Sequence, residues 1–427
     1  MGRVTDRASA PPHAASPPSA PASPRAASPL LAPLLSAEGQ ALLAELRDHD
    51  PAGELALATR LRREHPAELV SAALTQARLR QRAVAKFGAE DAYRMYFTPD
   101  GIEQATRSTV AAHRAARFRE LAPERRITDL CCGIGGDAIE LARAGFAVTA
   151  VDLDPLTCEI AAENLRTLAP AAPPATVTRA DVREYDLTGA RTVFIDPARR
   201  GGRGRIFDPE AYSPPLSWAV EAVRRAGTGA VKIAPGIPHE LIPDGFEAEW
   251  ISDSGDVKEA VLWYGHGGTP GSVTPGTRRA TLLTPGRPTA TLTGRGLPDP
   301  PVRTTGRFLY EPDGAVIRAH LVAEVAEELD GGLLDETIAY ITADAPRPTP
   351  YATAYEITDE LPFGLKKLKA LLREREVGIL TVKKRGSAVE PEELRRRLKL
   401  KGPHSATVFL TRVAGAPTML LGHPVEA

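Results

Sequence analysis

The sequence predicts an α/β core, in which a mostly parallel sheet is flanked by helices, between a helical N-terminal region and a small α+β domain. Three observations support this fold class. Short apolar runs alternate with amphipathic stretches between residues 126 and 263. Leucine and alanine recur with helical spacing before that segment, whereas helix and strand signals are mixed after it. The 427 residues are enough for two or three domains.

Composition limits the class of protein and its partners. With 43% apolar and 25% charged residues, the chain has the composition of a soluble globular protein. It lacks an apolar run of the roughly 18 to 20 residues that a membrane span needs, and it lacks a signal peptide, so we expect a cytoplasmic protein without membrane contact. Cys131, Cys132 and Cys158 have neither disulfide nor zinc-ligand spacing, so we expect no metal. Because the net charge is −1, a nucleic-acid partner would need a local basic surface.

The N-terminal part is predicted to consist of a tail followed by helices. Residues 1–33 are rich in Ala, Pro and Ser and predict a disordered tail. Residues 34–122 predict a helical region. Its last helix is expected to start in Phe97-Thr-Pro-Asp-Gly101, where a capping residue precedes an early proline, and to run without interruption to Phe118.

Short strand-like and helix-like runs predict the elements of the core and of the C-terminal part. Residues 123–265 form the predicted α/β domain, with strand-like runs at 127–130, 147–151, 176–179, 192–195, 230–233 and 260–263. Residues 266–306 are rich in Gly, Pro and Thr and predict a connector with short strands, such as 280–284. Residues 307–427 combine predicted helices at 312–329, 365–375 and 391–398 with predicted strands at 378–383 and 406–412.

A ligand site is predicted where four consecutive strands end. The first strand leads into Cys131-Cys-Gly-Ile-Gly-Gly136, a turn whose glycines allow close approach of a ligand to the backbone. The second ends in Val151-Asp-Leu-Asp154, which places a carboxylate where doubly wound folds bind a ribose diol. An acid follows each of the four strands at the same sheet edge: Asp129, Asp152, Asp181 and Asp196.

These residues favour S-adenosylmethionine over a nicotinamide dinucleotide as the ligand. A dinucleotide needs a third glycine at the helix start to hold its pyrophosphate, and position 138 is alanine. S-adenosylmethionine has no phosphate and carries a cationic sulfonium, which suits an edge lined with acids. We therefore expect S-adenosylmethionine as the cofactor.

The motifs resemble known families. Residues 97–263 resemble class I methyltransferases, particularly the trimethylguanosine synthase type of RNA methyltransferase, in Phe97-Thr-Pro-Asp-Gly101, Cys132-Gly-Ile-Gly-Gly136, Val151-Asp-Leu-Asp-Pro155 and the glycine pair Gly201-Gly202 after the fourth strand. Over nearly the whole predicted ordered length, the chain is similar to bacterial S-adenosylmethionine-dependent methyltransferases with a C-terminal THUMP-like domain. This resemblance implies a Rossmann-like, seven-stranded class I core and a THUMP-like α+β domain at 307–427.

The resemblance also implies roles for the cofactor-binding residues. Asp129, Gly133 and Gly135 would line the methionine part of S-adenosylmethionine. Asp152 would bind the ribose hydroxyls, with Leu153 beside it, and Asp181 would meet the adenine amine. The remaining two residues, Thr98 and Gln104, would close the site from the preceding helix.

The acceptor is expected beside the fourth strand. Amino-methyltransferases usually carry Asp/Asn/Ser-Pro-Pro-aromatic there, but this chain has Asp196-Pro197-Ala-Arg199. Asp196 and Pro197 are therefore the catalytic candidates, without the usual stacking ring. Arg199 could stack by its guanidinium plane or grip a phosphate. Alternatively, a base could stack on an aromatic residue: Tyr96, Phe207 or Tyr212. Methylation of a pyrimidine carbon is disfavoured, because all three cysteines precede this motif.

Three groups of basic residues are candidates for substrate binding. Arg199, Arg200 and Arg203 lie in a glycine-rich segment, either as a clamp on phosphates or as a solvated loop. Lys232 either reaches the substrate or extends to solvent from a strand edge. Residues 365–401 contain 13 Lys or Arg and 5 Glu, including Lys383, Lys384 and Arg385. By the likeness to THUMP-like domains, this segment would contact RNA.

The leading hypothesis is an RNA methyltransferase that acts on an exocyclic or ring nitrogen of a base. Two alternatives stay open: a protein or small-molecule methyltransferase, and a non-catalytic RNA-binding protein with the same fold. The oligomeric state does not follow from the sequence.

Overall fold

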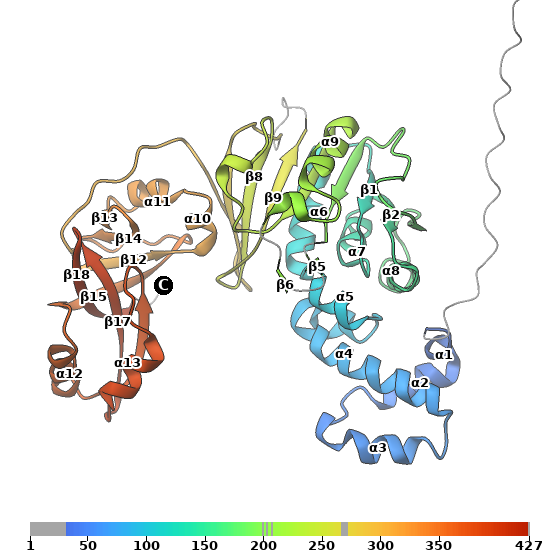
Figure 1. Ribbon diagram of the computed structural model, residues 1–427, viewed down its shortest axis with the longest axis horizontal. Helices are drawn as coiled ribbons and strands as arrows, with labels where there is room; N and C mark the ends of the chain where they lie inside the picture. Colours follow the sequence, from blue (N-terminus) through green and yellow to red (C-terminus); the bar gives the residue numbers. More distant parts are fainter. Residues whose placement is uncertain (1–30, 199, 202–203, 206–207, 266–271, 426–427) are drawn as a thin grey trace, which may run out of the picture.

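The computed structural model describes residues 31–198, 200–201, 204–205, 208–265 and 272–425, and they form an elongated molecule (Figure 1). N-terminal helices lie at one end, a large sheet occupies the middle, and a second sheet lies at the other end. We call residues 31–293 the first lobe and residues 308–425 the C-terminal lobe.

The first lobe begins with six helices that pack on one another, and α6 also packs on the large sheet. Leu31 and Leu34 are buried, so the last residues of the tail expected over 1–33 are instead packed, whereas 1–30 lie outside the described residues. The long helix α4 is interrupted at Gly88, where φ is 74°. The bounds are α1 Ala32–Leu35, α2 Ala37–Glu45, α3 Glu54–Leu61, α4 Ala67–Ala92, α5 Pro99–Gln104 and α6 Ser108–Leu121.

The single helix predicted from Thr98 to Phe118 is wrong, because the structure has two helices, α5 and α6. The ammonium group of Lys86 donates to the carbonyl oxygens of Ile102, Glu103 and Ala105 at 2.7, 2.8 and 2.9 Å. Carbonyls at the end of a helix lack partners within it, so this lysine stabilises the end of α5. The break leaves Thr106, which is buried, between the two helices.

The large sheet confirms the predicted α/β class. Its strand order is β11-β10-β8-β9-β7-β4-β1-β2-β3. β3, β2, β1, β4 and β7 run parallel, and β9 is antiparallel to both of its neighbours. The bounds are β1 Arg126–Leu130, β2 Ala147–Asp152, β3 Thr176–Arg179, β4 Thr192–Ile195, β7 Thr228–Ile233, β8 Glu247–Asp253, β9 Asp256–Tyr264, β10 Arg278–Leu283 and β11 Ala290–Thr293.

The sheet has two strands more than the seven expected. The additional strands, β10 and β11, come from the predicted connector at 266–306. β10 pairs with β8 in parallel and with β11 in antiparallel orientation. Ala280 and Leu282 of β10 are buried. Without β10, the edge strand on this side of the sheet would be β8.

Helices cover both faces of the large sheet. An apolar cluster on one face joins α6, α7 (Gly136–Arg143) and α8 (Pro155–Leu168) with the N-terminal helices. A second cluster, on the other face, joins α9 (Leu216–Ala226) with α10 (Gly314–Arg318) and α11 (Val322–Glu328). Since α10 and α11 belong to the C-terminal lobe, this second cluster anchors that lobe on the first.

The C-terminal lobe is the predicted α+β domain. Its strand order is β13-β14-β12-β15-β18-β17-β16, antiparallel except for β16 and β17. The single helix expected over 312–329 is instead two short helices, α10 and α11. The other bounds are β12 Phe308–Pro312, β13 Gly332–Asp335, β14 Ile338–Ala343, β15 Ala352–Pro362, α12 Leu365–Glu374, β16 Val377–Lys384, α13 Pro391–Leu398, β17 His404–Val413 and β18 Ala416–Pro424. Among the described helices, none is long and apolar enough to span a bilayer.

Candidate active site

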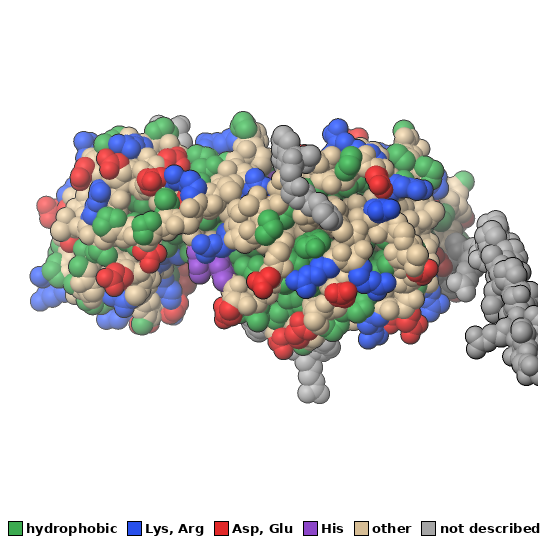
Figure 2. Space-filling model, turned by 90° about the horizontal axis from the view of Figure 1, so that it is seen from above, with side chains coloured by type: hydrophobic (Ala, Val, Ile, Leu, Met, Phe, Trp, Pro, Cys, Tyr) green, Lys and Arg blue, Asp and Glu red, His purple; other side chains and the backbone are tan. Residues whose placement is uncertain are grey.

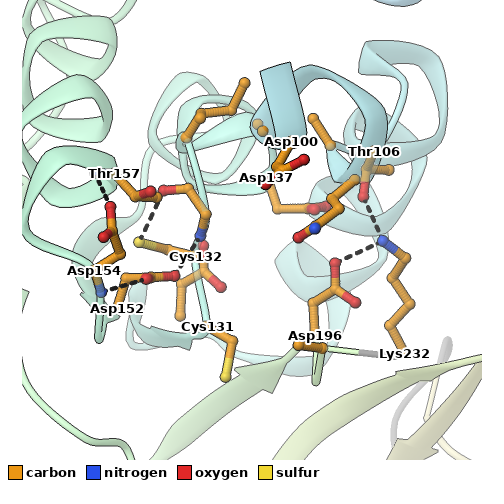
Figure 3. A pocket seen from close by; sticks show the side chains of 18 of the residues that line it. Asp100, Thr106, Cys131, Cys132, Asp137, Asp152, Asp154, Thr157, Asp196 and Lys232 are labelled. Atoms are coloured by element: carbon orange, nitrogen blue, oxygen red, sulfur yellow. Dashed lines mark hydrogen bonds and ion pairs between the residues drawn. The ribbon is translucent and has the colours of Figure 1, made fainter. Parts of the chain in front are cut away.

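A cavity of about 390 Å³ opens at the carboxyl ends of the parallel strands (Figure 3). Residues that end or follow β1, β2, β4 and β7 line one side of it. The α5 helix and the break before α6 line the other side, which includes Thr98 and Gln104. Ligands of open α/β sheets bind at this edge, and the volume lies in the usual range for a small-molecule site.

The glycine-rich turn forms the floor between β1 and α7. Gly133 and Gly135 have φ values of 55° and 88°, a left-handed conformation that side chains disfavour. The Gly133 amide donates to Oδ2 of Asp152 at 3.0 Å, and Oδ1 of Asp152 accepts from the amide of Asp154 at 3.1 Å. Asp152 therefore fixes the turn while it lines the cavity. Asp154 caps α8, because its carboxylate accepts from the Thr157 amide at 2.7 Å.

Asp129 is an isolated carboxyl at the base of the cavity. Its side chain is fully buried, and among the described residues neither of its oxygens has a hydrogen-bond partner. Burial, and then the charge of Asp196, raise the pKa of Asp129 to about 8. A buried carboxylate without a partner is costly, so this residue calls for a cationic group from outside the protein.

The charge of the cavity suits a cationic ligand. Its described lining contains one lysine, Lys232, and seven acids: Asp100, Glu103, Asp129, Asp137, Asp152, Asp154 and Asp196. A pyrophosphate would be repelled here, whereas the sulfonium and ammonium groups of S-adenosylmethionine would be attracted. The residues thus fit the cofactor that the motifs predict.

Asp196 and Lys232 meet at the other end of the same cavity (Figure 3). The Lys232 ammonium donates to Oδ2 of Asp196 at 2.6 Å and to the Thr106 hydroxyl at 2.9 Å. Lys232 is only 5% exposed, so it does not extend to solvent. Oδ1 of Asp196 has no hydrogen-bond partner among the described residues. Thr106 was missed in the sequence because the expected helix ran through it.

Of the predicted cofactor residues, Gly135 belongs to the glycine-rich turn without lining the cavity, and two more, Leu153 and Asp181, also lie outside the lining. The Leu153 side chain is exposed. Asp181 binds the Arg183 guanidinium, and the hydrogen bonds from Arg183 lower the pKa of Asp181 to about 2. In this structure neither residue shares the cavity with Asp129 and Asp152.

The expected acceptor clamp is only partly described. Arg199 and Arg203 lie outside the described residues, as does Phe207, and Arg200 belongs to the two-residue strand β5, Arg200–Gly201, which pairs with β6, Gly204–Arg205. The other two candidate stacking rings, Tyr96 and Tyr212, are 3% and 4% exposed. They are therefore part of the core and offer no open face to a base.

The predicted basic residues Lys383, Lys384 and Arg385 lie at the end of β16 and directly after it, in the C-terminal lobe, and carboxylates already pair with them. Glu311 accepts from Lys383 and lies 3.8 Å from Arg385. Lys384 donates to Glu390 at 2.6 Å. These three residues would have to leave their partners to bind a phosphate.

A buried ionic network holds α6 against the large sheet and was missed in the sequence. Arg114 is fully buried and binds Asp137 and Glu259. Glu249 accepts from His113 at 2.9 Å and from Arg117 at 2.9 Å. Because Asp137 also lines the cavity, the network ties α6 to the cofactor side of the site.

The cysteines do not supply a nucleophile at neutral pH. Burial, followed by the charges of nearby carboxylates, raises the pKa of the Cys131 and Cys132 thiols well above the usual range. Burial likewise raises the pKa of Cys158 to about 11. The thiolate is the reactive form, so the raised pKa values disfavour all three thiols as nucleophiles at neutral pH. Among the described residues, no cluster of His, Cys, Asp and Glu is arranged to hold a metal ion.

Comparisons with known families agree with this geometry. Residues 127–195 match a methyltransferase domain, and residues 352–424 match a THUMP domain-like family. Residues 29–83 match a domain of unknown function. A candidate methyltransferase from Porphyromonas gingivalis W83 has the same fold, with a TM-score of 0.73 at 20% identity, over 88% of this chain and 100% of that one.

Curated relatives identify the cofactor. An uncharacterised S-adenosylmethionine-dependent methyltransferase of Mycobacterium tuberculosis is 35% identical over 343 residues, which is 78% of this chain and 90% of the relative. The 23S rRNA (uracil(1939)-C(5))-methyltransferase of Acidithiobacillus ferrooxidans is 30% identical over 142 residues, 33% of this chain and 30% of the relative. The acid-lined cavity, the glycine-rich turn and the long match to the first relative lead to one conclusion: the chain belongs to the S-adenosylmethionine-dependent methyltransferases.

Proposed function

We propose that this methyltransferase acts on a nitrogen of an RNA base and that Asp196 orients the acceptor. The observation that carries this proposal is the Asp196–Lys232 pair, held by Thr106 in the cavity that contains the orphaned Asp129. Asp196 stands directly after β4, with one carboxylate oxygen bound to Lys232 and the other available to an N–H group.

The proposed mechanism assigns one task to each residue. S-adenosylmethionine, when bound, supplies an electrophilic methyl group on a cationic sulfur. Oδ1 of Asp196 accepts a hydrogen bond from the acceptor N–H and turns the nitrogen lone pair toward that methyl. Lys232 balances the charge of Asp196 and fixes its orientation. The nitrogen gains the methyl and loses its proton, for which Asp196 is the nearest acceptor. Positioning of this kind accounts for much of the catalysis of such transfers.

The residues around the site favour nitrogen over carbon as the acceptor atom. Methylation of a pyrimidine carbon commonly requires a cysteine nucleophile on the acceptor side. The segment after β7, the strand that carries Lys232, is Ala234-Pro-Gly-Ile237 and has no cysteine. The three cysteines line or adjoin the cofactor side, and their thiol pKa values are raised. The C5 specificity of the rRNA methyltransferase relative is therefore not carried over, whereas nitrogen methylation needs only a hydrogen-bond acceptor such as Asp196.

RNA is proposed as the substrate because of the C-terminal lobe. The THUMP domain-like match covers β15 to β18, and a distant relative modifies rRNA. The helices α12 and α13 present exposed lysines and arginines, which suit a phosphate backbone. These exposed basic residues are Lys366, Lys367, Arg373 and Arg396 on the helices, and Lys399 and Lys401 directly after α13. They replace Lys383, Lys384 and Arg385, which are paired with carboxylates, as the main candidates for phosphate contacts.

Mass spectrometry of RNA nucleosides from cells with and without the gene tests this proposal. We expect one nucleoside with a methylated base nitrogen to disappear without the gene and to return when the purified protein and S-adenosylmethionine are added to that RNA. If no nucleoside changes, RNA is not the substrate; if a carbon-methylated pyrimidine disappears, the role of Asp196 is wrong.

A further inference from the structure

Three aromatic rings form a continuous stack at the boundary between the two lobes. Trp250 of β8 is fully buried, and the His239 ring lies over it with ring centres 4.9 Å apart and an interplanar angle of 21°. His320, which follows α10, lies over His239 at 3.8 Å and 15°. His239 is partly buried, whereas His320 is exposed, so the stack runs from the core to the surface. Figure 2 shows histidine side chains in the notch between the lobes, beside basic side chains.

His320 takes a left-handed backbone conformation at the end of a helix. His320 has a φ of 56° and follows the last turn of α10, where amides of His320 and Leu321 close on the carbonyls of Ile317 and Val316. Glycine is the residue that most easily takes this conformation at a helix end. A histidine here costs stability, and its ring packs on His239 rather than in the apolar core. The backbone at this position therefore does not account for the presence of an aromatic ring.

The stack is built of neutral rings next to positive charge. Burial lowers the pKa of His239; burial, followed by the charge of Arg278, lowers the pKa of His320. Both imidazoles are therefore neutral near pH 7. His239 is tied to the C-terminal lobe by its Nε2 contact with the Arg318 carbonyl oxygen at 2.8 Å. The charged groups around the stack are Arg278, Arg318, Glu240 and Asp299.

The stack contacts the segment that follows Lys232, the residue paired with Asp196. The indole N–H of Trp250 donates to the Pro235 carbonyl at 3.0 Å. The Arg318 guanidinium lies against Gly236, where an added Cβ would meet it at 3.3 Å. Gly236 follows Lys232 by four residues, so their Cα atoms are at most about 14 Å apart. A single RNA strand covers such a distance with a few nucleotides.

We propose that the exposed face of His320 is a stacking platform for an unpaired base of the RNA substrate. The base would extend the Trp250–His239–His320 stack as a fourth ring, and Arg318 and Arg278 would attract the flanking phosphates. This proposal rests on the proposed RNA substrate. Aromatic side chains that bind bases in this way are tolerant of sequence, because every base has a π face. The platform would hold the strand while a neighbouring nucleotide occupies the acceptor site.

Fluorescence anisotropy with two labelled single-stranded probes tests the platform: a twelve-nucleotide oligo(A) and a backbone of equal length in which every site is abasic. The variant His320→Asn removes the ring, and asparagine tolerates the left-handed backbone. We expect it to weaken binding of oligo(A) about five-fold or more, since stacking is worth about 1–3 kcal/mol per base. Its affinity for the abasic probe and its salt dependence stay unchanged. Arg318→Gln, at an exposed position, should instead lower the salt dependence by about one phosphate contact.

His65→Asn in the N-terminal helices is the matched control and should bind both probes as the unchanged protein does. The platform is wrong if His320→Asn binds oligo(A) with unchanged affinity, or if the unchanged protein prefers oligo(A) no more than the abasic probe. If Lys366→Glu with Lys367→Glu abolishes binding while His320→Asn does not affect it, the proposed RNA substrate stands without the platform. If the unchanged protein binds neither probe, the RNA-binding premise itself fails.

Discussion

Binding of S-adenosylmethionine should become tighter as the pH rises toward 8, because Asp129 must ionise first. In the free protein, burial holds the pKa of Asp129 at about 8, and its oxygens lack partners among the described residues. A cationic ligand stabilises the carboxylate, so its arrival should expel the proton. The affinity for the ligand should therefore rise with pH below the raised pKa, because Asp129 must lose its proton before the cation can bind.

The size of the effect follows from the position of this pKa. With a pKa of about 8, about one tenth of Asp129 is ionised at pH 7 and about one hundredth at pH 6. The dissociation constant should thus fall about ten-fold between pH 6 and pH 7. The α-amino group of the ligand titrates near pH 8, so the comparison is best kept below that pH.

Isothermal titration calorimetry at about pH 6 and about pH 7, repeated in buffers with different ionisation enthalpies, measures both the affinity and the proton released. Asp129→Asn should bind weakly and show little pH dependence. Asp154→Asn is the matched control, because asparagine also caps α8, and it should keep the full dependence. An affinity that stays constant from pH 6 to pH 7 would refute the role of Asp129.

Three further outcomes follow from the buried charges of the first lobe. Arg114→Met should destabilise the protein by about 3–5 kcal/mol in urea unfolding, since it strands two buried carboxylates, whereas the exposed Arg166→Ala should cost at most about 0.5 kcal/mol. Asp129→Asn should raise the melting temperature more at pH 8 than at pH 6, because a raised carboxyl pKa makes stability fall with rising pH; an equal change at both values would count against it. Thr106→Val should slow methyl transfer and spare cofactor affinity, since it frees one hydrogen bond of Lys232; loss of cofactor affinity would contradict this role.

Several core strands could be predicted, because β4 is buried on both faces and the partly exposed β3 consists largely of Thr and Val, which favour strands. Strands such as β3 and β4 stand out as short apolar or β-branched runs, and their bounds agree with the predicted runs. The β8 strand was missed because Glu247 and Glu249 interrupt its apolar pattern. Their charges are compatible with burial because Arg117 and His113 reach them from α6 and Arg279 reaches Glu247 from β10. Local sequence does not reveal these contacts.

Some residues of the candidate site could likewise be predicted from the sequence, and others could not. The acids at strand ends could be located from the sequence, since parallel strands bring their carboxyl ends together. Thr106 could not, because the end of α5 depends on Lys86, a residue of another helix. The pairing of Lys383 with Glu311 of β12 was equally out of reach, as the two lie far apart in sequence.

Transfer of a labelled methyl group to RNA from cells that lack the gene tests the central claim most directly. The account predicts that the unchanged protein labels this RNA on a base nitrogen. It also predicts that Asp196→Ala loses about 100-fold or more of the transfer rate while it binds S-adenosylmethionine with nearly unchanged affinity. Equal transfer by the two proteins would contradict the account, because Asp196 would then have no part in orienting the acceptor.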